Sequence, residues 1–560
     1  MCGRNSDNQC WRARRAAPTL ALYNLRIVLP TDHAEPFNDD ERAKLAPYFT
    51  NTDRHVFALI NLPETVKGAL FARYSRSAKS LRRLFLDEFA QDMPATAPAA
   101  GVGTARADKL YDRVFNEYGD DSVAQLGGAH IACEYVSNIL TKVLEWGRLM
   151  AYLEQSTRYV PYTDTLHGRW RYHVPAEVTG ALRDQYTRTM DAAFEHYAKW
   201  IPAMQEHFAK RYPKTPTDSD AVHRAAIRAK ALDTLRGMLP AATQSNVGIY
   251  GTGQAFEALL LRMRAHPLDE VRACGGAMLE ELRKVIPAFL TRVDLPDRGG
   301  RWSEYFADCR QATLAAAESL LDASSDEADA RDEVTLTDFD PDGEVKIVAA
   351  ALYAVSDLPD DVLQSAARRM TADERAAVIR AYVGDRSNRR HRPGRAFERT
   401  SYRFDVLTDY GAFRDLQRHR LLTLEWQQLT TRHGYTEPEA IREAGAGDAW
   451  DRVMEGSAEL HEAMTSAGLR AAAQYAVAMA YRVRFYMEMN AREAMHLIEL
   501  RTAPQGHPAY RRVCQQMHRL IDERAGHHAV AAAMKYVDHS AVELERLGSE
   551  RALEGKRGKL

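Results

Sequence analysis

Residues 410–435 read YGAFRDLQRHRLLTLEWQQLTTRHGY, and this stretch guides the interpretation of the whole chain. It holds Arg418, His419 and Arg420 in succession, followed by a hydroxyl residue at Thr423. Residues at positions i and i+2 do not share a helix face, so Arg418 and Arg420 do not fit one row of helical salt bridges. A planar guanidinium group bonds phosphate oxygens in pairs, so clustered arginines suit a phosphate-bearing ligand.

A second stretch lies in the first half of the chain, where residues 148–159 read RLMAYLEQSTRY. It offers a carboxylate at Glu154, an amide at Gln155, a hydroxyl at Ser156 and a guanidinium at Arg158. Ser156 and its neighbouring backbone N–H groups could complete a phosphate cradle. The i, i+4 spacing of Glu154 and Arg158 equally allows an ion pair along a helix.

The order of features recurs in the two halves of the chain. Each half has a short apolar segment, a helix ending in an Arg-containing motif, a long helical region, and a late Leu-Arg pair, Leu261-Arg262 or Leu500-Arg501. A fixed order at this long period suggests duplication. The acidic, turn-rich stretch ASSDEADARDE separates the halves. We therefore expect an N-terminal extension over residues 1–50, a first copy over 51–315, a linker over 316–342 and a second copy over 343–560.

Helical patterns dominate both halves. Apolar residues recur at helical spacing, which predicts helices over residues 134–149, 255–263, 278–290, 471–486 and 491–500. Apolar runs typical of strands occupy residues 56–62, 345–352 and 402–407. The fold class is therefore expected to be α+β, with helices supplying most of the core.

These motifs resemble those of the flavin-dependent thymidylate synthases. Arg418-His419-Arg420 with Thr423 resembles the start of the family signature RHRxxSxNExSxR, and Glu154, Ser156 and Arg158 resemble its E, S and R. The resemblance implies two tandem, diverged copies of the thymidylate synthase-complementing-protein fold, which is helix-rich with a small sheet.

The resemblance continues along both halves. Asn490-Ala491-Arg492, then His496 and Arg501, are similar to the family pattern NxR, H/N and LR on its late helix. In the first half, Arg236-Gly-Met-Leu-Pro240 resembles the family element RxxLP, and Arg262 stands where the late arginine belongs.

Each copy departs from the family pattern, and the departures are complementary. The first copy has Trp146-Gly147-Arg148 in place of RHR and Gly251-Thr252-Gly253 in place of NxR. The second copy has Trp426, Gln428 and Thr430 in place of E, S and R, although a gapped alignment could bring Glu425 and Arg432 into those places. The first copy has therefore kept nucleotide-contacting positions, and the second has kept flavin-contacting positions.

The resemblance implies an enzyme that methylates dUMP to dTMP with FAD, NADPH and methylenetetrahydrofolate. It assigns the arginines of the late helices, Arg501 and Arg262, to stabilising a deprotonated uracil N3, which suits a group that never loses its own charge. The residues assigned to the flavin are Arg418, His419, Arg420, Asn490, Arg492 and His496. Those assigned to the nucleotide are Glu154, Gln155, Ser156, Arg158, Arg236 and Arg262.

Family sites form between subunits of a tetramer. A two-copy chain could therefore set the first-copy segment ending at Arg158 against Arg418-His419-Arg420, within one chain or across a dimer. A homodimer would then be a pseudo-tetramer with two-fold symmetry.

Several residues also have purely structural interpretations. Arg418 and Arg420 could lie on the surface, His419 could be a structural histidine, and Asn490 could cap a helix. Arg262 competes with Arg264, and either could pair with Glu270. Trp146 could pack in the core. His527, His528 and His539 lack a carboxylate or cysteine to complete a ligand set, so we expect no metal. Two further functions stay open: transfer of a different one-carbon group to a pyrimidine nucleotide, and a degenerate homologue that binds nucleotide or flavin without catalysis.

The composition narrows the class of protein. The 560 residues carry a formal net charge of −2, so no excess of positive charge would hold a nucleic acid. No apolar run is long enough to predict a membrane span, and residues 1–15 lack the apolar core of a secretion signal. The six cysteines form no CxxC pair, which favours the reducing cytoplasm.

Overall fold

The computed structural model describes residues 35–49, 51–53, 59–74, 79–93, 125–156, 158, 160–165, 168–321 and 331–557. The chain divides into two compact units, Met1–Leu110 and Tyr111–Leu560. Helices are the main element of both, and the two sheets of the second unit are antiparallel. The predicted α+β class is confirmed.

The first unit is a small group of helices around an aromatic core. Tyr48 and Phe49 pack against Phe85 with ring centroids 5.2 and 5.3 Å apart. The strand predicted over residues 56–62 lies partly outside the described residues, and its described part gives a single bridge between Leu59 and Phe49. The elements are α1 (Asp39–Leu45), α2 (Glu64–Tyr74), α3 (Leu81–Glu88) and η2 (Ala90–Asp92).

The first sheet of the second unit has the strand order β1-β3-β2. Helix α5 follows β1, and helix α8 follows β3 directly, so each of these helices begins where a strand ends. The elements are β1 (Gly128–Ser137), α5 (Asn138–Leu144), β2 (Met150–Glu154), α6 (Gly180–Arg211), α7 (Asp220–Leu235), η5 (Arg236–Met238), β3 (Gln244–Thr252), α8 (Gly253–Arg264), α9 (Asp269–Arg283), η6 (Pro287–Leu290), η7 (Pro296–Gly300) and α10 (Arg301–Leu320).

The second sheet has the strand order β4-β5-β7-β6. The elements are β4 (Val334–Phe339), α11 (Gly343–Tyr353), α12 (Asp360–Arg369), α13 (Ala372–Val383), η9 (Arg395–Glu398), β5 (Ser401–Asp409), α14 (Tyr410–Leu416), β6 (Thr423–Trp426), α15 (Glu439–Glu443), α16 (Gly447–Ser466), η10 (Ala472–Ala476), β7 (Arg482–Asn490), α17 (Ala491–Arg501), α18 (Pro508–Glu523), α19 (His528–Ala533) and α20 (Leu547–Arg557).

The two sheets belong to two copies of one arrangement. In each copy a strand, a short helix and a second strand lead into two helices, a 3₁₀ turn, a third strand and two more helices. The 3₁₀-to-strand connections of the two copies pair with each other. The Met479 N–H donates to the Leu239 carbonyl at 2.9 Å, the Ala241 N–H donates to the Val477 carbonyl at 2.8 Å, and Pro240 forms a bridge with Ala478. Equivalent segments that pair with each other are the signature of a two-fold relation, here within one chain.

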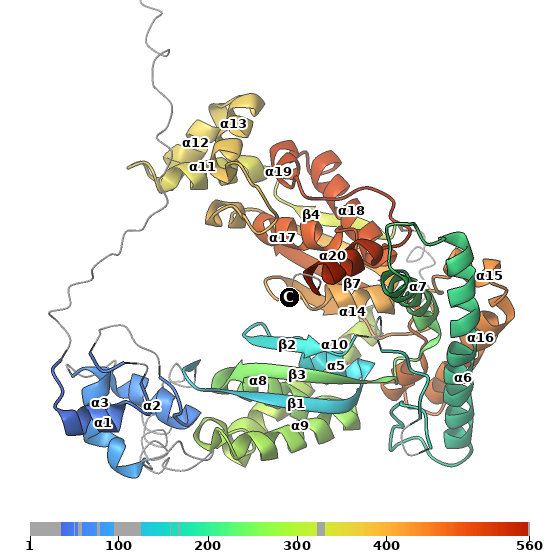
Figure 1. The fold of residues 1–560 in the computed structure, drawn as a ribbon, viewed down its shortest axis with the longest axis horizontal. Coiled ribbons are helices and arrows are strands. Elements are labelled where there is room, and N and C mark those ends of the chain that lie inside the picture. Colours follow the sequence, from blue (N-terminus) through green and yellow to red (C-terminus); the bar gives the residue numbers. More distant parts are fainter. Residues whose placement is uncertain are drawn as a thin grey trace, which may run out of the picture. The chain divides into compact units, whose positions relative to one another are not determined.

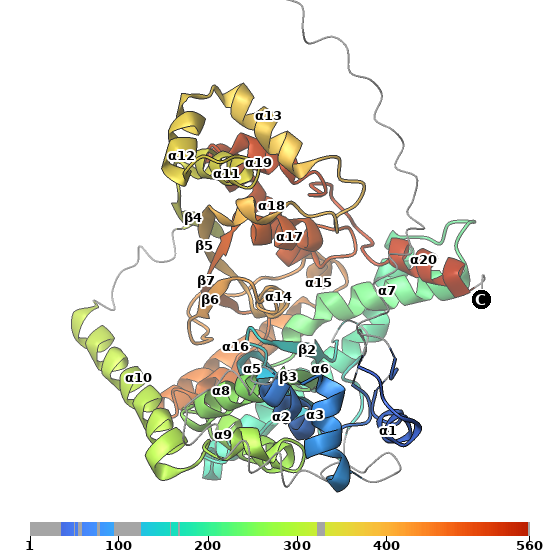
Figure 2. The ribbon, with the colours of Figure 1, turned by 90° about the vertical axis from the view of Figure 1, so that its left-hand side faces the viewer.

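This pairing brings α14 of the second copy against α5 and β2 of the first (Figure 1; Figure 2 gives the perpendicular view). The Tyr410 hydroxyl donates to the Asn138 carbonyl at 3.0 Å, and the Gln417 amide donates to the Lys142 carbonyl at 3.0 Å. The motif helix of the second copy is therefore anchored on the first copy through buried hydrogen bonds.

The predictions for single elements met different outcomes. The helices over residues 255–263 and 491–500 are confirmed as α8 and α17, and the strand over 402–407 lies within β5. The predicted strand over 345–352 is wrong, because this segment is helix α11. Its run VKIVAAAL is buried on several sides, which hides periodicity, and its alanines favour the helix.

Of the other three helix predictions, two hold only in part and one is wrong. Residues 134–149 are strand β1 up to Ser137 and helix α5 from Asn138, and helix α9 ends at Arg283 before the 3₁₀ turn η6. The predicted helix over 471–486 is wrong: it is the 3₁₀ turn η10 followed by β7, whose residues alternate between buried and half-buried. The segment expected as a linker contains the end of α10 and all of β4, which pairs with β5.

Candidate functional site

A buried ion-pair cluster joins the two copies at Glu154. This carboxylate ends β2, has a side chain only 3% exposed, and accepts from the Arg414 guanidinium of α14 at 2.8 Å. Lys142 lies 3.3 Å and Arg418 3.9 Å from its other oxygen. Burial alone would raise the pKa of Glu154, but the charges of Arg414, Lys142 and Arg418 outweigh it and hold the pKa at about 2. The Glu154 carboxylate therefore holds the side chains of Lys142, Arg414 and Arg418 together at the boundary between the copies.

Arg158 is bound within the first copy. Its Nε lies 2.9 and 2.8 Å from the two Asp233 oxygens, and its Nη2 lies 2.6 Å from Oδ2. Its remaining Nη1 donates to the Gln505 carbonyl of the second copy at 3.2 Å. Glu154 and Arg158 therefore pair with other groups, and the i, i+4 ion pair does not form.

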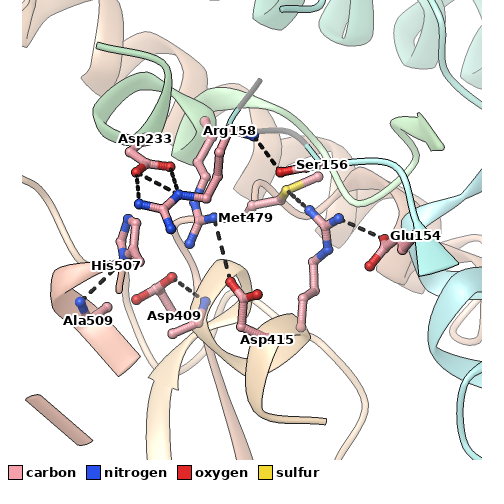
Figure 3. A network of polar contacts seen from close by, with 12 residues as sticks. Glu154, Ser156, Arg158, Asp233, Asp409, Asp415, Met479, His507 and Ala509 are labelled. Carbon is pink, nitrogen blue, oxygen red and sulfur yellow. Dashed lines mark hydrogen bonds and ion pairs between the residues drawn. The ribbon is translucent and has the colours of Figure 1, made fainter. Parts of the chain in front are cut away.

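Arg236 and Asp415 approach each other across the boundary between the copies. Figure 3 shows Asp415 of the second copy among Glu154, Arg158 and Asp233 of the first. Arg236 is 5% exposed, and its Nη1 lies 3.9 Å from Asp415 Oδ2. Asp415 also pairs with Arg418, and with Arg501 at 3.8 Å. Burial would raise the pKa of Asp415, but these guanidinium groups hold it well below its usual range.

A free hydrogen-bonding edge remains on Arg236. Its buried Nη2 has no hydrogen-bond partner in the described part of the chain. A Cβ added to Gly411 would come within 3.1 Å of that nitrogen, so the glycine leaves space there. A buried guanidinium edge with open space in front of it fits an incoming anion.

The first-copy segment and the second-copy motif line one small cavity of about 30 Å³. A larger cavity of about 320 Å³ shares Arg236 and Gly411 with it and continues past Asp233, Asp409 and His507. The sequence-predicted nucleotide residues Glu154, Gln155, Ser156, Arg158 and Arg236 thus meet the second copy in cis. The second-copy residues lining the small cavity are Gly411, Arg414, Asp415 and Arg418.

His419 is a buried, neutral histidine held from both sides. Arg501 Nε donates to His419 Nε2 at 2.9 Å, so the ring proton lies on Nδ1 and faces Glu493 Oε1 at 3.2 Å. Burial and the positive charge of Arg501 keep the pKa of His419 well below its usual range. Burial raises the pKa of Glu493 to about 7. This tautomer fixes the orientation of Arg501, whose Nη2 donates to the Asp415 carbonyl at 2.5 Å.

Three other residues predicted to bind flavin belong to the start of helix α17, which contacts His419 through Glu493. The Asn490 side chain caps α17 by accepting from the Glu493 N–H at 2.9 Å, so the helix-cap interpretation is confirmed. Arg492 donates to the Pro393 carbonyl at 2.9 Å. His496 packs beside His419 with ring centroids 5.7 Å apart, and its buried Nδ1 has no hydrogen-bond partner in the part of the chain that is described.

One group in the described residues has donor atoms close enough to hold a metal: His419, Glu493 and His496, within 4.8 Å of one another. Arg501 donates to one nitrogen of His419, and Arg392 lies 3.5 Å from His496 Nε2. These positive charges oppose a cation at the same place. We therefore keep the prediction that the protein binds no metal here.

Arg262 lies on a different cavity from the Glu154 cluster. Its guanidinium carbon sits 5.1 Å above the Trp146 ring, and Trp146 in turn meets Trp426 edge to face at 6.2 Å. The two copies have equivalent positions here: Glu154 is the last residue of β2 and Trp426 the last residue of β6. Likewise, Trp146 lies two residues after α5, and Arg418 lies two residues after α14. The charged pairing at one boundary is thus replaced by a tryptophan pair at the equivalent boundary.

Arg414, Asp415 and Asp233 are central to the site but were not predicted from the sequence. Arg414 and Asp415 stand four and three residues before Arg418, and Asp233 stands three residues before Arg236. Charged residues one helical turn before a functional arginine were the available signal.

The fold and the site define a class: a chain of two tandem copies of one α+β fold, with an arginine-rich polar site between the copies. The sequence model of the family described as thymidylate synthase complementing protein matches residues 68–288 and 335–525. The chain belongs to the thymidylate synthase complementing protein family.

The relatives span almost the same length. A UPF0159 protein of Chlamydia muridarum is 36% identical over 523 residues, covering 92% of this chain and 98% of that protein. A UPF0159 protein of Thermoplasma acidophilum is 29% identical over 511 residues, covering 86% and 97%. A solved structure of the UMP/dUMP methylase PolB from Streptomyces cacaoi, bound with 5-Br dUMP, is 19% identical with a TM-score of 0.28, over 36% of this chain and 94% of that one.

Proposed function

We propose that this protein is a FAD-dependent thymidylate synthase-like enzyme that methylates dUMP to dTMP at a site composed of both copies. The observation that carries the proposal is the shared cavity, in which Glu154, Ser156 and Arg158 of the first copy meet Arg414 and Arg418 of the second. Membership in the thymidylate synthase complementing protein family supports methylation of a nucleotide. We include FAD, methylenetetrahydrofolate and NADPH in the proposal because the resemblance to the flavin-dependent thymidylate synthases implies them.

The residues around this cavity suit a nucleotide monophosphate. The buried free edge of Arg236 and the Ser156 hydroxyl offer donors to a phosphate. Glu154 and Asp415 orient the surrounding guanidinium groups. An incoming phosphate would take over part of that role, so the arginines need not rearrange.

Arg501 is the proposed catalytic residue. It is locked by His419 and the Asp415 carbonyl, and its permanent charge can stabilise a uracil ring that has lost its N3 proton. Arg262, which sequence reasoning paired with it, lies on the other cavity, so we place it outside this site.

The residues around His419 fit a flavin. The buried Nδ1 of His496 is without a partner in the described part, and Arg418, Arg420 and Arg492 supply guanidinium groups for a diphosphate. When bound, reduced flavin would supply a hydride, methylenetetrahydrofolate the carbon, and NADPH the reducing power.

An activity assay tests the proposal. Purified protein is incubated with FAD, NADPH, dUMP and methylenetetrahydrofolate labelled in the methylene carbon, and dTMP is followed by mass spectrometry. The proposal expects labelled dTMP from the wild type and none from Arg501→Ala. A labelled product with UMP alone would favour the related one-carbon transfer. No product, with dUMP or FAD still bound, would favour the degenerate homologue.

The assembly and location complete the proposal. A homodimer would form a pseudo-tetramer, as the family arrangement implies. We propose a cytoplasmic protein with a nucleotide as ligand and no nucleic acid partner. No helix in the described ranges is both long and apolar enough to cross a membrane.

A further inference from the structure

Three arginines of the proposed site converge on one carboxylate. The Asp415 side chain pairs with Arg418, and its oxygens lie 3.8 Å from Arg501 Nη1 and 3.9 Å from Arg236 Nη1. These guanidinium groups come from three separate segments: η5, α17 and the residues that follow α14. Like charges repel, so guanidinium groups from distant segments gather around an anion that offsets their repulsion. Asp415 is that anion here.

The space beside Asp415 is too small for a phosphate group. The cavity lined by Ser156, Arg236, Asp415 and Arg418 has a volume of about 30 Å³. That is room for roughly two or three water molecules, at about 10–15 Å³ each. The larger neighbouring cavity is lined by Arg236 but not by Ser156 or Arg418, so a phosphate inside it would not reach all three side chains. A ligand phosphate and the Asp415 carboxylate therefore compete for the same place.

The Asp415 side chain can turn away from the arginines without disturbing them. Its side chain is 14% exposed, against 3% for Glu154. The main chain of Asp415 has a contact of its own, because its carbonyl accepts from Arg501 Nη2 at 2.5 Å. A change of rotamer would therefore remove the carboxylate and leave Arg501 anchored.

Protonation does not release Asp415. Burial would raise the pKa of its carboxyl, but the charges of Arg418, Arg501 and Arg236 hold that pKa well below its usual range. The carboxylate therefore leaves the arginines only when another anion replaces it. A phosphate monoester brings nearly two negative charges and three strong acceptor oxygens, so it competes for arginines better than a singly charged group does.

We propose that Asp415 is a resident counter-ion of the nucleotide site, which the phosphate of the ligand displaces on binding. The inference rests on the proposed function, because it takes a phosphate to bind among these arginines. Asp415 is then a specificity-determining residue. A nucleotide monophosphate can take the place of the carboxylate, whereas a nucleoside has no anion with which to do so.

The test compares Asp415→Asn with Asp415→Glu in calorimetric titrations with dUMP, deoxyuridine and inorganic phosphate. Asparagine keeps the size of the side chain and removes the competing charge. Asp415→Asn should therefore bind dUMP and inorganic phosphate about ten- to a hundred-fold more tightly than wild type, the effect of freeing one charged hydrogen-bonded contact. Deoxyuridine affinity should stay within about two-fold. Asp415→Glu keeps the charge and should bind dUMP no more tightly than wild type.

The stability of Asp415→Asn gives a second measurement that needs no nucleotide. In phosphate-free buffer this variant should unfold at a lower temperature than wild type, because its arginines lose their anion, and added phosphate should restore much of the difference. Glu499→Gln is the matched control. Glu499 pairs with Arg386 at 2.6 Å, both side chains are buried, and neither residue lines the two cavities at the Glu154 cluster. Glu499→Gln should lose stability that phosphate does not restore.

The outcomes separate this inference from the proposed function. Equal or weaker dUMP binding in Asp415→Asn, with deoxyuridine binding unchanged, would overturn the inference and leave the proposed function in place. Failure of Asp415→Asn to fold even with phosphate would also overturn it, because the carboxylate would then be structural. If neither protein binds dUMP but phosphate stabilises Asp415→Asn more than wild type, the displacement is supported and the proposed nucleotide is wrong.

Discussion

Replacing Glu154 should reveal how strongly the two copies depend on one buried charge. In Glu154→Ala, Arg414, whose side chain is only 7% exposed, loses its carboxylate partner; among the described residues, the hydrogen bond that it keeps runs to Met479 Sδ at 3.4 Å. Removing one partner of a buried ion pair typically costs about 3–5 kcal/mol, because the other charge stays buried without compensation. Lys142 keeps Glu145 at 2.5 Å, so the loss falls mainly on Arg414.

The matched control removes both charges together. The double variant Glu154→Leu with Arg414→Met replaces the pair with apolar side chains, and such replacements are often neutral or stabilising. Urea unfolding followed by circular dichroism gives the free energy of unfolding of each variant. The reasoning predicts a loss of about 3–5 kcal/mol for Glu154→Ala and under about 1 kcal/mol for the double variant. A loss below about 1 kcal/mol in Glu154→Ala, or equal losses in both, would refute it.

Three further predictions concern the residues around this cluster. Arg158 neutralises the buried Asp233, so nucleotide binding should be tested in the double variant Arg158→Ala with Asp233→Asn, which leaves no unpaired charge. Calorimetry should show that this variant binds dUMP about ten- to a hundred-fold more weakly and FAD as tightly as wild type. Unchanged dUMP affinity would exclude Arg158 from the site. Arg420→Ala should weaken FAD more than dUMP in the same titrations; equal losses would mean that the ligands are not divided between the copies as proposed. Burial raises the pKa of Glu493 from 4.5 to about 7, so its proton stabilises the fold below about pH 4.5 and this contribution is lost as the pH rises through 7. Wild type should therefore lose about 3 kcal/mol more than Glu493→Gln between about pH 4 and pH 8, and parallel stability curves would contradict the buried carboxyl.

The sequence predicted the parts of the fold whose pattern is local. Helices α8 and α17 have clear apolar stripes, and β5 has a clear apolar run, so these elements were found. Helix α11 was taken for a strand, because a segment buried on several sides shows no period that separates helix from strand. Strand β7 was taken for a helix, because an alanine-rich approach to the strand resembles the start of a helix.

Site residues that belong to a sequence motif could be predicted, whereas those brought to the site only by tertiary contacts could not. Arg418 and Arg158 were found from their resemblance to the family signature, whereas Asp233 was found only in the structure, where it pairs with Arg158 from helix α7. Arg262 matched the late Leu-Arg pattern but faces Trp146. The sequence aligned Gly251 with Asn490, whereas the structure places Thr252 at the equivalent helix cap. Successive side chains of a helix point about 100° apart around its axis. A one-residue error in aligning the two copies therefore changes the predicted direction of every later side chain on the helix.

We propose that one working nucleotide site per chain forms between the copies at the Glu154 cluster. A crystal structure of the protein with FAD and 5-bromo-dUMP tests it most directly, because anomalous scattering locates the bromine without ambiguity from side chains. The account predicts one bromine per chain beside Arg501, with the phosphate bonded to Arg236 and Ser156 and reached by Arg418. A bromine beside Trp146 and Arg262, or two equivalent bromines per chain, would contradict the account.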